Sequence, residues 1–283
     1  LPYWIERWNA AEGVIWCKIP FIPAESSKFI WMIYGNPNAK SESNGNAVFE
    51  MFNVQGIVGF WHMDEPQWTG ATGEVRDETG MNHGTAKNGA TTTSDAKYGR
   101  AGLFDGSDGY VEVPDSDSLD VSSEVTIEAW ALTKGILSTN DHILRKDDAY
   151  GMWVEDTLRP WGRVWMSNGA GANLPRNKTI TTNEWHHLVI TADSNELKVK
   201  MYIDGDFNSQ VDYDGTIQES TVKLFIASYK GGESYWNGTI DEVRIWERAL
   251  TPTEVQILSK NYMQKMGSYF NVRKYVTPAP VVI

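Results

Sequence analysis

Apolar and charged residues alternate along residues 240–246, and a period of two is typical of a β-strand. Strict alternation places Ile240 and Glu242 on one face of this strand and Asp241 and Val243 on the other. Both faces then carry charged residues, so we expect the strand to lie inside a sheet whose outer face is partly covered. The Thr-Pro-Thr-Glu run that follows predicts an N-cap, a first-turn proline and a short helix.

Short apolar runs separated by turn signals continue through most of the chain. The turns contain Asn-Gly, Asp-Gly and Gly-Gly pairs, which favour tight connections between antiparallel strands. Many short strands at this spacing predict an all-β fold, a two-sheet antiparallel sandwich over residues 53–262. The runs lie at residues 57–64, 101–113, 125–133, 183–190 and 199–205.

The two ends of the chain have strand-like patterns of their own. Residues 1–52 predict a small β-rich accessory domain with strands at 1–6, 13–20 and 29–34. Residues 263–283 predict one more strand and a Pro-rich exit. Because neither piece forms a complete sheet alone, we expect the C-terminal strand to pack on the accessory domain. The chain begins at Leu1 inside a strand-like run, as expected of a fragment of a longer precursor.

Four of these stretches together carry a family resemblance. Residues 101–113, 125–130, 183–190 with 199–205, and 238–255 resemble, in order, strands of laminin-G-like, concanavalin A-like jelly rolls, the superfamily that includes pentraxins. The resemblance implies a jelly-roll sandwich. Residues 1–52 resemble the C-terminal half of the prokaryotic domain of unknown function 2341, which often precedes such modules in bacterial and archaeal surface proteins. It implies an extracellular or cell-surface location in a prokaryote and a role in adhesion.

Composition narrows the possible partners. The 283 residues hold 25 basic and 37 acidic side chains, a net charge of −12, which argues against nucleic acid and against anionic membrane surfaces. No apolar run is long enough to insert in a membrane. A single cysteine, Cys17, excludes an internal disulfide within these residues. The 13 tryptophans exceed what a core needs, so we expect aromatic surface.

Calcium is the cofactor that the acidic residues suggest. Asp105 and Asp108 lie in a Gly-rich turn, and Asp241 begins the closing strand. Calcium prefers several oxygen ligands from carboxylates and turn carbonyls. The resemblance implies a structural calcium ion on the convex side of the sandwich at Asp241, with Asp105 as a further ligand. The alternative is that these aspartates cap turns by accepting backbone N–H bonds.

Two further sets of residues are candidates for ligand binding. Asp147 and Asp148 lie where pentraxins carry ligand-face calcium, but the acidic run that completes the pentraxin site is absent, which favours a solvated turn. Trp161 and Trp236 have polar or turn neighbours and are candidate platforms for stacking a sugar ring. Tryptophans within strand patterns are expected in the core.

An enzymatic site has less support. Glycoside hydrolases use two carboxylates that flank the scissile bond, and the laminarinase-like branch of this fold supplies them as Glu-x-Asp-x-x-Glu, which is absent here. We therefore expect no enzyme but an extracellular binding module for a glycan or a cell-surface protein. The alternative is an assembly unit of a surface structure or filament that self-associates through the incomplete N-terminal domain. A glycoside hydrolase is a third, weaker hypothesis.

Overall fold

The computed structural model describes residues 3–8, 13–17 and 55–260. The chain divides into two units, one formed by residues 1–55 and 261–283 and the other by residues 56–260. In the first unit, β1 (Tyr3–Trp8) pairs antiparallel with β2 (Gly13–Cys17), which confirms two of the three strands predicted there. The strand expected at 29–34, and the C-terminal strand with its packing, lie outside the described residues.

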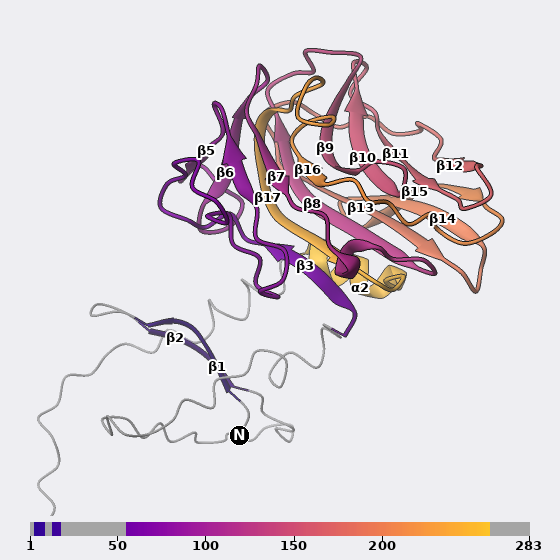
Figure 1. Ribbon diagram of the computed structural model, residues 1–283, viewed down its shortest axis with the longest axis horizontal. Helices are drawn as coiled ribbons and strands as arrows, with labels where there is room; N and C mark the ends of the chain where they lie inside the picture. The colour runs from indigo at the N-terminus through magenta and orange to yellow at the C-terminus, as the bar shows by residue number, and fades with distance from the viewer. Residues whose placement is uncertain (1–2, 9–12, 18–54, 261–283) are drawn as a thin grey trace, which may run out of the picture. The chain divides into compact units, whose positions relative to one another are not determined.

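Residues 56–260 form two antiparallel sheets that lie face to face (Figure 1). The predicted fold class, a two-sheet jelly-roll sandwich, is confirmed. The seven-stranded sheet has the order β12 (Gly171–Asn173), β11 (Pro160–Trp165), β10 (Tyr150–Glu155), β9 (Asn140–Lys146), β16 (Leu224–Ile226), β7 (Tyr110–Val113) and β4 (Thr85–Lys87). The eight-stranded sheet has the order β15 (Asp206–Asp212), β14 (Lys198–Ile203), β13 (His186–Asp193), β8 (Val125–Thr133), β17 (Asn237–Trp246), β6 (Ala101–Asp105) and β5 (Thr91–Thr93), with β3 (Ile57–Trp61) paired to β17.

The core lies between the two sheets and follows the two-residue period of the strands. In β10, Tyr150, Met152 and Val154 all belong to this core. Trp153 lies between them in sequence and contacts rings on the other face of the sheet. Side chains on the outer face of the seven-stranded sheet therefore do not contribute to the core between the two sheets.

Strand β17 departs from the alternation that the sequence predicts. Glu242 has a φ of 53°, and the pairing with β8 shifts register between Asp241 and Arg244. Such a β-bulge adds one residue to a strand and changes which face the later side chains occupy. Ile240 and Val243 therefore both lie in the core, whereas Glu242 pairs with His62 and Arg244. The expectation that Ile240 and Glu242 share a face is wrong for this reason.

Helix α2 (Pro252–Ser259) begins where the sequence predicts. The Thr251 hydroxyl accepts a hydrogen bond from the Glu254 amide, and the Glu254 carboxylate accepts one from the Thr251 amide, which forms a capping box. The helix buries Val255 in a second, smaller apolar cluster with Trp246 and Leu250. The helix therefore follows directly from the end of β17 and covers its last residues.

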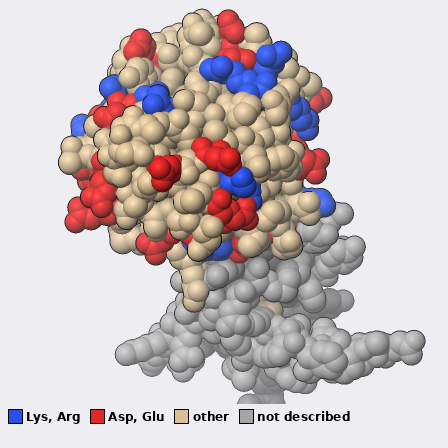
Figure 2. All heavy atoms as spheres, turned by 90° about the vertical axis from the view of Figure 1, so that its right-hand side faces the viewer, with Lys and Arg blue, Asp and Glu red and all other residues tan. Residues whose placement is uncertain are grey.

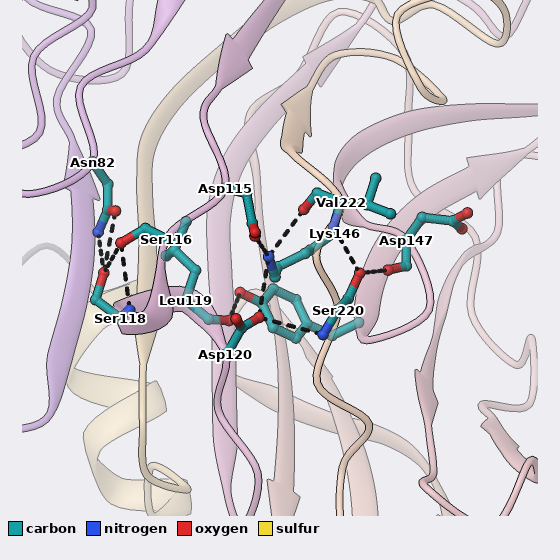
Figure 3. A network of polar contacts seen from close by, with 11 residues as sticks. Asn82, Asp115, Ser116, Ser118, Leu119, Asp120, Lys146, Asp147, Ser220 and Val222 are labelled. Atoms are coloured by element: carbon teal, nitrogen blue, oxygen red, sulfur yellow. Dashed lines mark hydrogen bonds and ion pairs between the residues drawn. The ribbon is translucent and has the colours of Figure 1, made fainter.

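A buried lysine connects β9 to two loops of the same domain (Figure 3). The Lys146 side chain is fully buried, and its Nζ lies 2.5 Å from Asp115 Oδ1 and 3.2 Å from Asp120 Oδ1. The same ammonium donates to the carbonyl of Val222 at 2.9 Å. A buried ammonium is tolerated when it is paired and its N–H groups find acceptors, as they do here. Asp120 follows the short 3-10 helix η1 (Asp117–Leu119).

Candidate functional site

The outer face of the seven-stranded sheet carries a row of large side chains on β11. Trp161, Arg163 and Trp165 occupy alternate positions and are each half-buried, while Gly162 and Val164 between them are buried. Because successive side chains of a strand point to opposite faces, the first three share the outer face. Two aromatic rings and one guanidinium are thereby presented along a single strand.

A hollow of about 220 Å³ lies on this face, across β9, β10, β11 and β12. Eight side chains line it, and none is an aspartate or glutamate. Three are tryptophans, two are arginines, two are asparagines and one is a histidine: Asn140, His142, Arg145, Trp153, Trp161, Arg163, Trp165 and Asn173. The hollow therefore combines aromatic walls with hydrogen-bond donors.

The aromatic walls are held in place by contacts among themselves. The Trp153 ring is nearly buried and meets Trp161 edge-on, with ring centroids 4.6 Å apart and an interplanar angle of 76°. The guanidinium of Arg145 lies 4.8 Å from the centre of the Trp165 ring and 4.2 Å from that of Tyr229. These edge-to-face and cation–π contacts order the rings before any ligand arrives.

Two cations share one buried carboxylate beside the hollow. Arg145 Nε donates to Asp147 Oδ1 at 2.9 Å, and Lys230 Nζ lies 2.5 Å from Asp147 Oδ2. Burial acts to raise the pKa of Asp147, but the hydrogen bonds from Lys230 and Arg145 outweigh it and hold that pKa below its ordinary value. Asp147 is therefore ionised at neutral pH and fixes the position of Arg145.

His142 is a neutral residue in the lining of the hollow. Burial and the neighbouring charge of Arg145 lower the pKa of His142 to about 3, so the imidazole is neutral at physiological pH. Its Nε2 lies 3.3 Å from Arg145 Nη1, and because a guanidinium only donates, Nε2 must be the acceptor. The proton then resides on Nδ1, which is buried and has no hydrogen-bond partner among the described residues.

The predicted aromatic platforms have different outcomes. Trp161 lines the hollow, and its indole Nε1 donates to Asn140 Oδ1 at 3.1 Å. Trp236 is 0% exposed, lies in the core and donates to the carbonyl of Thr239, so its prediction as a platform is wrong. A polar sequence neighbourhood, on which that prediction depended, does not determine the direction of a side chain.

The predicted aspartate pair at the β9–β10 turn does not form a cation site. Both oxygens of Asp147 contact cationic groups, and its side chain is buried rather than solvated. Asp148 is exposed with a φ of 61°, a turn conformation that aspartate tolerates. The structure therefore contradicts both a calcium-binding role for this pair and, for Asp147, the solvated-turn alternative.

The predicted calcium ligands are not all brought together. Asp105 is paired with Asn237, four residues before Asp241, a separation of about 13 Å along the strand. Asp105 Oδ1 accepts hydrogen bonds from the Ser107 and Asp108 amides, so Asp105 caps its turn. Asp108 Oδ1 accepts from the Gly89 amide. A shared site for Asp105 and Asp241 is therefore wrong, and turn capping describes Asp105 and Asp108.

Asp241 lies instead beside the loop that contains Tyr98 and Arg100, and backbone amides of this loop bind both Asp241 and Asp64. Asp241 is 0% exposed, and its Oδ2 accepts from the Tyr98 amide at 2.8 Å. The Arg100 amide, two residues on, donates to Asp64 Oδ1 at 2.6 Å. Burial, with the nearby charge of Glu242, raises the pKa of Asp241. Sequence reasoning missed Asp64, although it ends the apolar run at 57–64.

The donor set around Asp241 is incomplete as a side-chain cage. Its Oδ1 is buried and lacks a hydrogen-bond partner, which suits a group that binds a cation. Within the described residues, however, no cluster of three or more His, Cys, Asp or Glu side chains has metal-binding geometry. A calcium ion here would need backbone carbonyls and water to complete its six to eight oxygen ligands.

Comparison with known proteins gives the family context. Residues 105–256 match the family model of the concanavalin A-like lectin/glucanases superfamily, and residues 1–63 match that of a domain of unknown function, DUF2341. Human adhesion G-protein coupled receptor D1 is 40% identical over 76 residues, 25% of this chain. The match spans 8% of that receptor. In the described part of the chain, the one α-helix is too short and too polar to cross a bilayer.

Two solved structures share the fold. Domain 4 of an extracellular arabinanase from Geobacillus stearothermophilus, in complex with arabinotriose, is 20% identical, with a TM-score of 0.56 over 72% of this chain and 98% of that one. The binding domain of Paraclostridial Mosquitocidal Protein 1 is 18% identical, with a TM-score of 0.58 over 73% of this chain and 52% of that one. At these identities the likeness shows the fold alone.

Proposed function

The chain belongs to the concanavalin A-like lectin/glucanases superfamily, and from this premise we propose that it is a non-catalytic carbohydrate-binding module of the prokaryotic cell surface. Its sugar lies in the hollow on the outer face of the seven-stranded sheet. The observation that carries the proposal is the pair of half-buried tryptophans, Trp161 and Trp165, that line this hollow. The arabinotriose complex of the arabinanase domain adds support at the level of the shared fold.

The chemistry of the hollow suits a sugar. The C–H faces of a pyranose or furanose ring are apolar and stack on indole rings, while its hydroxyls need fixed polar partners. Asn140 accepts from Trp161 Nε1, and this contact directs the amide of Asn140 along the same face. A volume of about 220 Å³ is below the 300–1,000 Å³ of sites that enclose a drug-sized ligand. We expect one sugar ring in the hollow and the rest of the chain outside.

The lining of the hollow also favours binding without hydrolysis. Glycoside hydrolases place two carboxyl groups about 5–10 Å apart across the scissile bond. The eight lining side chains include no carboxylate. Asp147 contacts the lining residue Arg145, and it also pairs with Lys230. These contacts keep the pKa of Asp147 below the range that a general acid needs. We therefore expect no glycosidase activity from this face.

The proposed function is tested by truncating the two platforms. We expect Trp161→Ala and Trp165→Ala each to weaken binding of an oligosaccharide ligand, found on a glycan array, by about tenfold, because one stacking contact contributes about 1.4 kcal/mol. Phe207→Ala is the matched control, since Phe207 is a 57% exposed aromatic on β15 of the other sheet. Undiminished binding by both folded tryptophan variants would refute the assignment of the hollow.

We also propose that Asp241 and Asp64 hold a structural calcium ion, with backbone carbonyls as further ligands. The partnerless, buried Oδ1 of Asp241 and the loop amides that fix both carboxylates support this. A cation that binds only the folded protein raises the unfolding midpoint by mass action. We expect calcium to raise the midpoint of the wild type and not of Asp241→Asn. An equal midpoint in calcium and in EDTA would make Asp241 a loop anchor only.

The alternative function, an assembly unit of a surface structure or filament, depends on the N-terminal domain and not on the hollow. Self-association was predicted through the N-terminal domain, most of which lies outside the described residues. It stays a prediction, as does a cell-surface protein as partner. Sedimentation of the full chain with and without oligosaccharide separates the two functions, because a lectin does not need to self-associate to bind sugar.

A further inference from the structure

The unsatisfied polar atoms of the hollow are all donors. Among the described residues, two buried side-chain atoms without a hydrogen-bond partner belong to the lining: His142 Nδ1 and Arg163 Nε. Arg163 can only donate, and His142 Nδ1 carries the ring proton because Nε2 faces Arg145. Both atoms are shielded from solvent, so a ligand in the hollow reaches the half-buried Arg163 through the terminal N–H groups of its guanidinium. A ligand here must bring acceptors.

The charge of the hollow is positive and incompletely neutralised. The lining holds two guanidinium groups and no carboxylate. Asp147 pairs with Arg145 but is shared with Lys230. Within residues 55–260, no carboxylate forms an ion pair with Arg163, whose guanidinium carbon lies 4.7 Å from the centre of the Trp165 ring. Arg163 is therefore a cation without a counter-charge, in a chain whose net charge is −12.

Arg163 is held in place by its surroundings. A Cβ atom at Gly171 would lie 2.1 Å from Arg163 Nε, so the guanidinium packs directly against the backbone of strand β12. The stacked indole of Trp165 supports its other side. A positioned guanidinium can donate two parallel hydrogen bonds to a carboxylate or sulfate, a geometry that a neutral hydroxyl does not match. Figure 2 shows Lys and Arg side chains in several places on the face that it presents, with the largest group near its upper edge.

We propose that the hollow selects anionic saccharides, in which a carboxylate or sulfate on the sugar ring accepts hydrogen bonds from Arg163 while the ring stacks on Trp161. This inference rests on the proposed function and names its ligand class. The acid group supplies acceptors for the guanidinium N–H groups and the counter-charge that Arg163 lacks. A neutral sugar of the same shape supplies neither the charge nor the paired geometry.

The experiment compares sugars that differ in one group. Isothermal titration of the full chain uses oligogalacturonate, its carboxyl-reduced neutral counterpart and a sulfated oligosaccharide. We expect an anionic sugar to bind at least about tenfold more tightly than the neutral one, and this advantage to shrink as salt screens the charge. Binding of the sulfated but not the carboxylated sugar would assign the charge to sulfate within the same class.

Variants separate this inference from the proposed function. Arg163→Gln is expected to abolish the preference for the anionic sugar, so that the ratio of the affinities for the anionic and the neutral sugar falls to about one. Arg159→Gln, an exposed arginine beside β11, is the matched control and should change neither. Equal affinity for anionic and neutral sugars in the wild type, with loss of both in Trp161→Ala, would overturn the anionic preference and leave the proposed function standing. Failure of every sugar to bind the folded wild type would overturn both.

Discussion

Trp161 and Trp236 show what sequence can and cannot determine for a single residue. Both are tryptophans with polar neighbours, yet one lines the hollow and the other is fully buried. The direction of each ring depends on which face of which sheet its backbone occupies, and that information lies in the pairing partners. His142 was missed for the same reason, since its role comes from Arg145 and Trp153, which contact it only in the folded sheet.

Gly151 tests whether the aromatic walls are pre-ordered. An added Cβ would lie 2.8 Å from the Trp153 ring and 3.2 Å from Arg145 Cγ. We predict that Gly151→Ala costs about 1–3 kcal/mol of unfolding free energy by overpacking and also weakens sugar binding. Chemical denaturation followed by tryptophan fluorescence measures the first effect. Gly232→Ala, where no atom lies within 4 Å, is the control. Equal stability of both variants would show that the Trp153 ring moves aside freely.

The ion pairs of Asp147 predict a pH dependence of stability. Its pKa is lowered in the folded protein, so its stabilising contribution is complete above the ordinary aspartate pKa of about 3.9 and is lost as pH falls through the lower, folded value. We predict that the wild type is more stable than Asp147→Asn at pH 7 and that this difference disappears in acid. Urea titrations of both proteins from neutral pH to about pH 2 measure it. A difference that persists in acid would contradict the role of the charge.

At the scale of single strands and helices, the sequence predicted where the strands lie more reliably than which face of a strand each side chain occupies. The closing strand, its helix and the N-cap of that helix were all predicted from local patterns. The bulge at Glu242 was not, because a one-residue register shift becomes visible only against the partner strand β8. It brings Glu242 beside Arg244, whose guanidinium also contacts Glu128 at 2.7 Å. A buried ionic network follows from that single extra residue.

Arg244 should be the most costly charge to remove from this sheet. Arg244 contacts two buried carboxylates, Glu128 and Glu242. Its replacement by an apolar residue removes this cation from both carboxylates. We predict that Arg244→Met lowers the unfolding free energy by about 3–5 kcal/mol. Arg159→Met, which removes an exposed cation 4.0 Å from Glu155, should change it by less than about 1 kcal/mol. Similar losses in the two variants would show that burial adds nothing to the network.

At the scale of the whole molecule, the fold was predictable and the site was not. The order of four strand motifs predicted the sandwich, since such patterns depend on local alternation and turns. The hollow is formed by β9 to β12, which antiparallel pairing brings side by side, and no single stretch of sequence contains its chemistry. The calcium prediction grouped Asp241 with Asp105, whereas the structure places Asp241 beside a loop that also binds Asp64, because register decides which aspartates meet.

The central claim, that sugar binds on the outer face of the seven-stranded sheet, is tested most directly by the indole N–H signals of the tryptophans. Each signal in a ¹⁵N-labelled sample is assigned by a Trp→Phe variant, and oligosaccharide is then added. We predict that the signals of Trp161 and Trp165 shift, while those of Trp61 and Trp236, both 0% exposed in the core, do not. Saturable shifts at other tryptophans, with Trp161 and Trp165 unmoved, would contradict the claim.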